Sequence, residues 1–209
     1  MSVTAAVILA CVAGYVDVLS YLTDGTFVAN MTGNTVLLAI SLVRANWHSA
    51  EDYSASIAAF VIGAVLARLL LRKTACHRCA LAAAAMAVLI ATPLWEFPRM
   101  LVLAAAMGLQ DAAVNHFAGL SINTVFVSGT LVRLGDAVAN VGDKPASSWT
   151  ALHLGSVWLG YVVGGAVGAI ATRIAPLPAF DFRLSAAAVV LGLLAVFAQV
   201  RRSGDSSHD

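Results

Sequence analysis

The sequence predicts an all-α integral membrane protein, and three observations lead to this fold class. Of the 209 residues, 60% are hydrophobic and only 11% are charged, whereas soluble domains carry about 25% charged and about 45–50% apolar residues. The apolar residues gather in runs whose length is close to that of a helix that crosses a bilayer, about 20 residues. The net charge is +1, which offers no basic surface for nucleic acid. A soluble domain, a disordered chain and a nucleic-acid-binding protein are therefore excluded.

Six segments are apolar enough to span a bilayer, and short polar joints separate them. The expected spans are 5–22, 56–72, 80–95, 100–117, 150–171 and 184–200. The expected joints are 44–55, 73–79, 96–99 and 172–183, and a polar tail covers 201–209. The first segment lacks a basic region before it and a clean cleavage site after it, so we expect a retained span rather than a signal peptide.

Two further stretches, 26–43 and 120–143, fit a simple span less well. The first is apolar only in its second half, and the second carries Arg133 and Asp136. Each can be a poor span, a re-entrant hairpin or a broken helix. Irregular backbone at membrane depth survives only where protein or water satisfies its polar groups.

An internal repeat explains this order of segments. Three pairs of strings match in the same order: 14–17 with 108–111, 27–35 with 125–130, and 60–67 with 162–169. Their offsets are 94, 96 and 102 residues, close to half the chain. We therefore expect one membrane domain, 1–209, in two pseudo-symmetric halves of about 5–95 and about 100–200. Transporters are commonly built from such repeats.

The distribution of basic residues predicts the topology. Three spans per half invert the second half, and an N-terminus inside then leaves six basic residues in inner loops and four in outer loops. The inner set is Arg72, Lys73, Arg78, Lys144, Arg201 and Arg202, and the outer set is Arg44, Arg99, Arg173 and Arg183. Eight spans would give five on each side. The positive-inside rule favours six spans with both termini in the cytoplasm.

Several strings resemble the YoaK family, a bacterial inner-membrane family with no assigned function. They are Gly-Tyr-Val-Asp at 14–17, Phe-Val-Ala-Asn-Met-Thr-Gly-Asn-Thr at 27–35, Met-Gly-Leu-Gln-Asp-Ala-Ala-Val at 107–114 and Thr-Val-Phe-Val-Ser-Gly-Thr-Leu at 124–131. The resemblance covers nearly the whole chain and implies a multi-pass protein of the inner membrane, without naming a substrate. It also implies Asn after the Gln of the second half. Asp111 departs from that pattern, so the family's common mechanism does not require an acid there.

Two acids inside expected spans are the first candidate site residues. An acid near the middle of a span costs about 2.5–3.5 kcal/mol on insertion scales. Asp17 has two interpretations. It can bind a cation or a proton, or it can be a structural acid that hydrogen-bonds a neighbouring helix end. Asp111 has polar neighbours in Gln110 and Asn115, and positions 111 and 115 share a helix face. This second group is either a pore or substrate site or interhelical hydrogen bonding.

The two stretches of uncertain type each begin with residues that start helices. The candidate binding residues there are Asn30, Thr32, Gly33, Asn34 and Thr35 in the first half and Ser128, Gly129 and Thr130 in the second. Ser, Thr and Asn cap helix N-termini, and Gly lets the backbone break. A half-helix N-terminus near the membrane centre binds anionic or dipolar groups. The alternative is an ordinary cap at a surface joint.

These features predict a small-solute transporter or channel, with the lipid bilayer and a small molecule or ion as partners. The alternative is a non-transporting scaffold or accessory subunit. We expect no enzyme, catalytic residue or cofactor, because no catalytic-triad order, Walker loop or His-Glu-x-x-His string occurs. Cys76 and Cys79 lack the second pair that a zinc site needs, so no metal is expected. The small-residue faces at Gly63 and Gly164 favour packing within the chain over a homo-oligomer.

Overall fold

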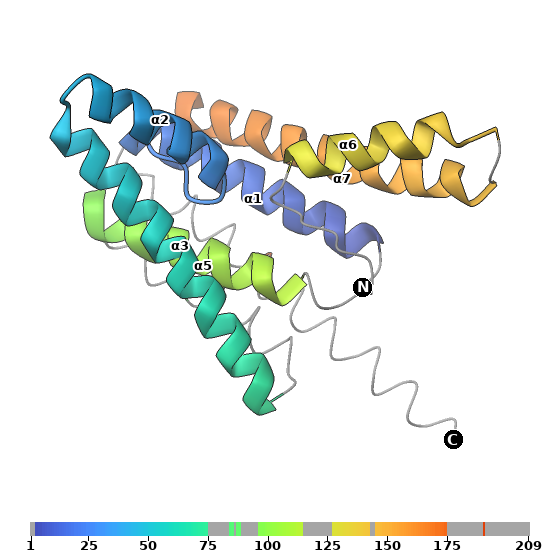
Figure 1. Cartoon of the computed structure of the whole chain (residues 1–209), viewed down its shortest axis with the longest axis horizontal. Helices are drawn as coiled ribbons and strands as arrows, with labels where there is room; N and C mark the ends of the chain where they lie inside the picture. Colours follow the sequence, from blue (N-terminus) through green and yellow to red (C-terminus); the bar gives the residue numbers. More distant parts are fainter. Residues whose placement is uncertain are drawn as a thin grey trace.

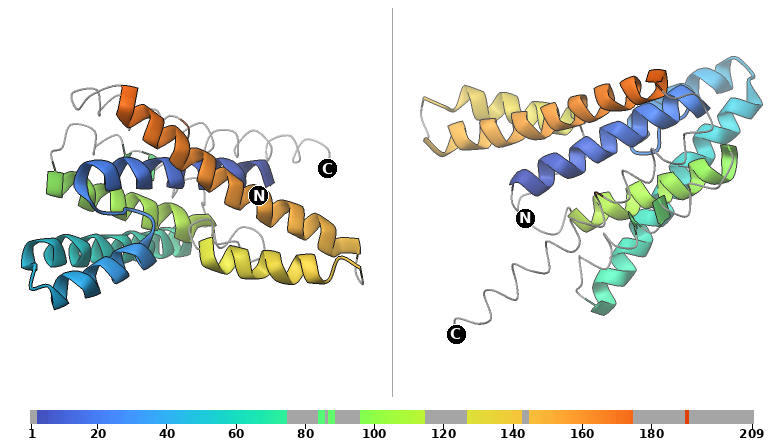
Figure 2. Two further views of the ribbon diagram at one scale, coloured as in Figure 1. Left: turned by 90° about the horizontal axis from the view of Figure 1, so that it is seen from above. Right: turned by 180° about the vertical axis from the view of Figure 1, so that it is seen from behind.

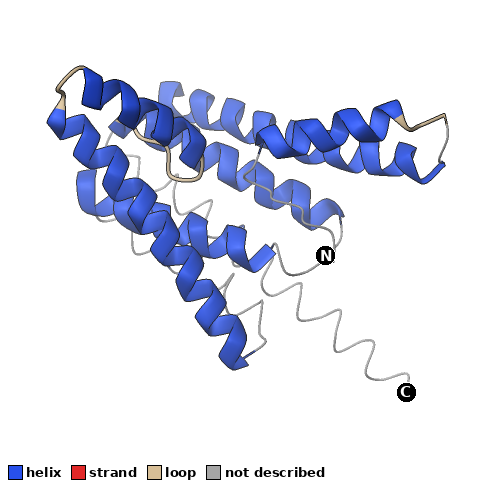
Figure 3. Ribbon diagram, in the orientation of Figure 1, coloured by secondary structure: helices blue, strands red, loops and turns tan. Residues whose placement is uncertain are grey.

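The computed structural model describes residues 3–74, 84–85, 87–88, 96–114, 127–142, 145–174 and 190. Its helices are α1 (Val3–Asp24), α2 (Met31–Val43), α3 (Trp47–Thr74), α5 (Glu96–Val114), α6 (Val127–Ala139) and α7 (Pro145–Ile174). Within these ranges the ordered elements are helices and none is a strand (Figure 3). The predicted all-α class is confirmed.

Three described helices are long and apolar enough to cross a bilayer: Val3–Asp24, Trp47–Arg72 and Ser148–Ile174. They coincide with the expected spans 5–22, 56–72 and 150–171. The expected span 100–117 falls on α5, of which the structure describes Glu96–Val114. The expected spans 80–95 and 184–200 lie almost wholly outside the described residues, as does the polar tail 201–209.

Three expected joints are partly helical, which corrects the predicted boundaries. Helix α3 begins at Trp47, inside the expected joint 44–55, and α5 begins at Glu96, so the joint 96–99 is its first turn. Helix α7 continues to Ile174. Asn46 starts α3 early, because its side-chain oxygen accepts the amide of Ser49 at 3.3 Å and caps the helix. Apolar runs mark where a helix is buried in lipid, and helices continue beyond that depth.

The long helices pack in two close pairs, α1 with α7 and α3 with α5, while α2 lies on α3 and α6 lies on α7 (Figure 1). Glycines allow the backbones to touch. Between α1 and α7, a Cβ added at Gly14 would lie 2.1 Å from the carbonyl oxygen of Tyr161, and one at Gly164 would lie 1.9 Å from the carbonyl oxygen of Cys11. Between α3 and α5, a Cβ added at Gly63 would lie 1.9 Å from the carbonyl oxygen of Ala105, and one at Gly108 would lie 2.0 Å from the carbonyl oxygen of Phe60. The small-residue faces of α3 and α7 are therefore used for packing within the chain.

The core lies around α1 and α5, and the outer faces of α3 and α7 remain apolar. Fully buried core side chains include Leu9, Val16, Leu103 and Met107. Large exposed apolar side chains on the outer faces are Val61, Ile62, Val65, Leu66 and Leu69 on α3 and Val162, Val163, Val167 and Ile170 on α7. Contiguous apolar surface of this kind is rare on soluble monomers, and a bilayer would cover it.

The short helices α2 and α6 both begin near the middle of the molecule and run to opposite ends (Figures 1 and 2). Each has 13 residues, and at about 1.5 Å per residue neither reaches more than about 20 Å. The hydrocarbon layer is about 30 Å thick. Neither helix alone can cross it, so the first uncertain stretch, 26–43, is a non-helical segment followed by a short helix.

Candidate functional site

The non-helical segment Gly25–Asn30, between α1 and α2, is largely buried. Thr26, Val28 and Ala29 are at most 1% exposed. Gly25 has φ +70°, a left-handed conformation that suits glycine. Buried backbone without a regular ladder needs other hydrogen-bond partners, and three side chains, one each from α1, α2 and α3, supply them.

The carboxylate of Asp17, from α1, is the main partner of this segment. Its Oδ1 accepts the backbone N–H groups of Val28 at 2.9 Å, Ala29 at 2.6 Å and Asn30 at 3.2 Å. Its Oδ2 accepts the hydroxyl of Tyr161, from α7, at 2.6 Å. Asp17 is 1% exposed, its bonds to Val28 and Ala29 are buried, and those to Asn30 and Tyr161 are partly buried. Oδ1 thus holds the backbone that leads into α2, and Oδ2 ties Asp17 to α7.

Asn34 pairs with both backbone groups of Phe27. Its Oδ1 accepts the Phe27 amide at 3.0 Å, and its Nδ2 donates to the Phe27 carbonyl at 2.7 Å. The same Nδ2 donates to Ser56 Oγ at 3.1 Å, and the Ser56 hydroxyl donates to the Phe27 carbonyl at 2.9 Å. Ser56 belongs to α3, so this set of contacts joins the segment to a second long helix.

The other residues of the first predicted motif divide into two groups. Asn30 is the N-cap of α2, and its Oδ1 accepts the Gly33 amide at 3.1 Å. A Cβ on Gly33 would lie 2.9 Å from the Phe27 ring, so glycine fits this position. Thr32 and Thr35 are exposed, although the Thr35 hydroxyl donates to its own helix at the Met31 carbonyl, at 2.8 Å.

The second predicted motif is described only in part. Gln110 is fully buried, and its Nε2 donates to the Leu9 carbonyl at 3.3 Å, whereas its Oε1 has no hydrogen-bond partner. Asp111 and Thr130 are also buried, at 6% and 7% exposure. Ser128 and Gly129 are exposed at the start of α6. Asn115 lies outside the described residues.

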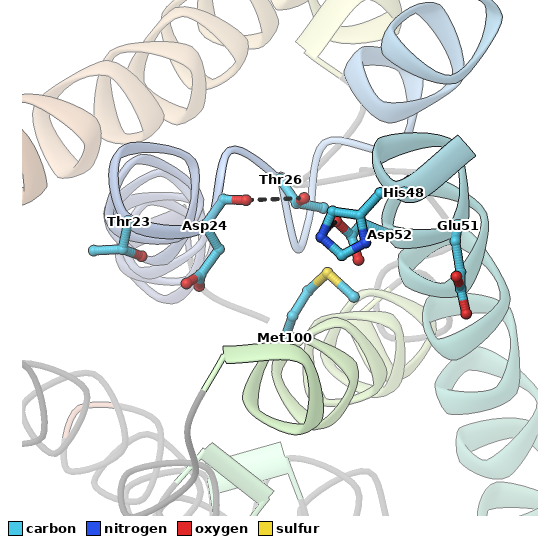
Figure 4. Close-up of a pocket in the computed structure, with 7 residues that line it drawn as sticks. All are labelled: Thr23, Asp24, Thr26, His48, Glu51, Asp52 and Met100. Atoms are coloured by element: carbon cyan, nitrogen blue, oxygen red, sulfur yellow. Dashed lines mark hydrogen bonds and ion pairs between the residues drawn. The ribbon is translucent and has the colours of Figure 1, made fainter. Parts of the chain in front are cut away.

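The structure adds a pocket that the sequence reasoning missed. Its volume is about 360 Å³, and it is lined by Thr23, Asp24, Thr26, His48, Glu51, Asp52 and Met100. These residues come from the end of α1, the segment after it, the start of α3 and the start of α5 (Figure 4). Asp24 forms an ion pair with Arg99 beside it. The acidic residues at neighbouring span ends were the available signal. Asp17 does not line this pocket.

The fold and this network define a helical membrane protein in which side chains of long helices anchor a short helix. The chain belongs to the family described as "Protein of unknown function (DUF1275)", whose model matches residues 5–197. YoaK is a member of this family, so the resemblance seen in the sequence is confirmed. No curated protein and no solved structure matches the chain. Among the residues that the structure describes, no three His, Cys, Asp or Glu side chains gather as metal ligands.

Proposed function

We propose that the protein is a small-solute transporter or channel of the inner membrane, built from two inverted repeats. The observation that carries this proposal is the placement of α2 and α6, which begin near the middle of the molecule and run to opposite ends (Figures 1 and 2). In transporters made of inverted repeats, the N-termini of such half-helices meet the solute near the bilayer midplane.

The glycine contacts support the repeat. One set is Gly14 on Tyr161 and Gly108 on Phe60, and the other is Gly164 on Cys11 and Gly63 on Ala105. In both sets the α5 residue lies 94 positions after its α1 counterpart, and the α7 residue lies 101 positions after its α3 counterpart. Two-fold symmetry between the halves would produce these matching contacts. In such an arrangement the first helix of each half packs on the third helix of the other half. The contacts favour matching Gly63 with Gly164 rather than with Gly165.

In this proposal Asp17 and Asn34 position the N-terminus of α2, and the solute meets other groups. Both oxygens of Asp17 and both polar atoms of the Asn34 amide are used on the backbone of Gly25–Asn30 and on neighbouring side chains. The exposed hydroxyls at the helix starts are Thr32 in α2 and Ser128 in α6. Such hydroxyls suit a polar pathway better than contact with lipid.

A solute screen on the purified protein tests this function. We expect one class of small solutes to raise the midpoint of thermal unfolding, and the same solutes to enter proteoliposomes that contain the protein. Thr32→Val, which removes one hydroxyl with little change in shape, should weaken the stabilisation. Thr4→Val, at an exposed position in the first turn of α1, is the matched control and should keep it. If no solute shifts the midpoint and none is taken up, the accessory-subunit alternative is favoured.

A further inference from the structure

Each of the two connections at opposite ends of the molecule, α2–α3 and α6–α7, leads into a helix that begins with an exposed tryptophan (Figure 1). Trp47 is the first residue of α3 and is 68% exposed. Trp149 lies near the start of α7 and is 67% exposed. It follows Trp47 by 102 positions, nearly the offset of 101 that relates Gly63 to Gly164. The repeat therefore places the same aromatic side chain at both ends.

The surroundings of these tryptophans are partly apolar and partly polar. Exposed valines accompany both: Val43 ends α2, and Val141 lies in the α6–α7 connection. One turn after Trp47, Glu51 lines the acidic pocket, so hydrocarbon does not suit this depth. Tryptophan is enriched at the membrane–water interface, because its ring is apolar and its indole N–H donates a hydrogen bond. The headgroup layer of a bilayer accepts both kinds of group.

The lengths of α3 and α7 match the thickness of a bilayer. Their far ends carry arginines at matching positions, Arg72 and Arg173, which follow the tryptophans by 25 and 24 residues. At about 1.5 Å per residue these distances are about 36–38 Å. The hydrocarbon layer is about 30 Å thick, and the headgroup regions extend it to about 40–45 Å. Each helix can thus place its tryptophan in one headgroup layer and its arginine in the other, where long basic side chains reach polar groups.

We propose that the two connections are lipid-binding tips: Val43 with Trp47 enters the headgroup layer of one leaflet, and Val141 with Trp149 enters that of the opposite leaflet. The partner of both surfaces is the phospholipid headgroup layer. This inference goes beyond the proposed function, because it applies to a transporter and to an accessory subunit alike.

The depth of the tips also sets the depth of the short helices. Helix α2 runs about 18 Å from Val43 back to Met31, and half of the hydrocarbon layer is about 15 Å. Helix α6 has the same number of residues and runs to the other end of the molecule (Figure 1). Tips fixed in opposite headgroup layers would therefore hold both helix starts near the middle of the bilayer.

Fluorescence quenching by brominated phospholipids measures the depth of each tryptophan. The chain has four tryptophans, and each test protein keeps one and has phenylalanine at the other three positions. In liposomes, bromine near the headgroup end of the acyl chain should quench Trp47 and Trp149 more strongly than bromine near the chain terminus. Trp158 is the matched control, because it lies nine residues further along α7, about 13 Å from Trp149. It should show the reverse order.

Cysteine labelling tests whether the two tips lie on opposite sides. In a protein with Cys11, Cys76 and Cys79 replaced by alanine, a membrane-impermeant maleimide added to intact spheroplasts should label only one of Trp47→Cys and Trp149→Cys. The other should react only after lysis. Reporter fusions at the two connections read the same sides if a cysteine variant does not accumulate.

Three results would overturn the proposal. Stronger quenching of Trp47 or Trp149 by the deep bromine would place that tip in hydrocarbon. No quenching by either lipid would mean that water, another protein or a second copy of this chain covers it. Labelling of both cysteines from one side would contradict opposite leaflets. If a single-tryptophan protein fails to fold, the quenching lost in Trp47→Phe or Trp149→Phe alone gives the same depth. Since no solute is used, the outcome is independent of the solute screen.

Discussion

Asp17 is a buried acid without a basic partner, and its burial is explained by the backbone amides that it holds. An acid in a span costs about 2.5–3.5 kcal/mol. Three buried amides without acceptors would cost about 1–3 kcal/mol each, and the Asp17 Oδ1 satisfies all three. The second cost equals or exceeds the first. The acid therefore stabilises the non-helical segment and need not bind an ion.

The first prediction separates the acceptor role of Asp17 from its charge. Asp17→Ala should lower the free energy of unfolding by about 3 kcal/mol or more, because it leaves three buried N–H groups unpaired. Asp17→Asn should cost much less, since its amide oxygen can still accept the three amides. Unfolding in detergent micelles measures both. If the two variants are equally damaged, the charge of the carboxylate matters more than its acceptor geometry.

The reverse exchange at Asn34 is the matched control for that prediction. Asn34→Asp keeps the shape but loses the amide donor and places a carboxylate oxygen against the Phe27 carbonyl, which Nδ2 now contacts at 2.7 Å. Two facing acceptors repel one another, so Asn34→Asp should destabilise the protein more than Asp17→Asn does. Equal effects would mean that the network tolerates any polar group of this size.

At the scale of helices, close backbone contact depends on particular glycines. Gly164 lies against Cys11 of α1, where a Cβ would meet the carbonyl oxygen at 1.9 Å. Gly155, on the same helix, has nothing within 4 Å of the corresponding Cβ position. Helices in membranes associate through such small residues, because apolar burial alone does not distinguish a neighbouring helix from lipid.

The second prediction compares these two glycines within α7. Gly164→Ala should push α1 and α7 apart and lower stability by about 1–3 kcal/mol, the usual cost of overpacking. Gly155→Ala should leave stability unchanged or raise it by about 0.5–1 kcal/mol, because alanine is the better helix former. Midpoints of thermal unfolding report both effects. A loss at Gly155 as large as that at Gly164 would show that the close contact is unimportant.

At the scale of the whole molecule, the α2–α3 connection and the α6–α7 connection lie at opposite ends (Figure 1). This placement fits the topology predicted from basic residues, in which the two halves are inverted. The acidic pocket of Asp24, Glu51 and Asp52 then opens near the α2–α3 end, on the side predicted to face away from the cytoplasm.

The third prediction is the side of the membrane on which each connection lies. Reporter fusions at Asn46 should be periplasmic, and fusions at Gly142 and at the C-terminus should be cytoplasmic, because basic residues favour the inner loops. Alkaline phosphatase and fluorescent-protein fusions read opposite sides. A periplasmic C-terminus would contradict the six-span inverted arrangement and favour eight spans.

Much of the fold could be predicted from the sequence, because burial in lipid leaves a direct trace in composition. The expected spans 5–22, 56–72 and 150–171 coincide with long apolar helices. The early starts of α3 at Trp47 and of α5 at Glu96 could not be predicted in this way. Hydrophobicity does not distinguish helical from non-helical residues outside the hydrocarbon layer, because both are polar there.

Of the network that holds Gly25–Asn30, the sequence predicted Asp17 and Asn34 as site residues, but neither Ser56 and Tyr161 nor the role of any of the four. Apolar runs of span length and few charges specify a helical membrane protein whatever the tertiary arrangement. Each run that enters lipid must satisfy its own backbone hydrogen bonds, and a helix does so. The role of Asp17 depends on Tyr161, which lies 144 residues away, and on three amides of a segment with no regular structure. The spacing of residues in the sequence does not show that groups so far apart along the chain come into contact. Packing of α1 against α7 brings these groups together, and this contact turns an isolated acid into the anchor of a helix.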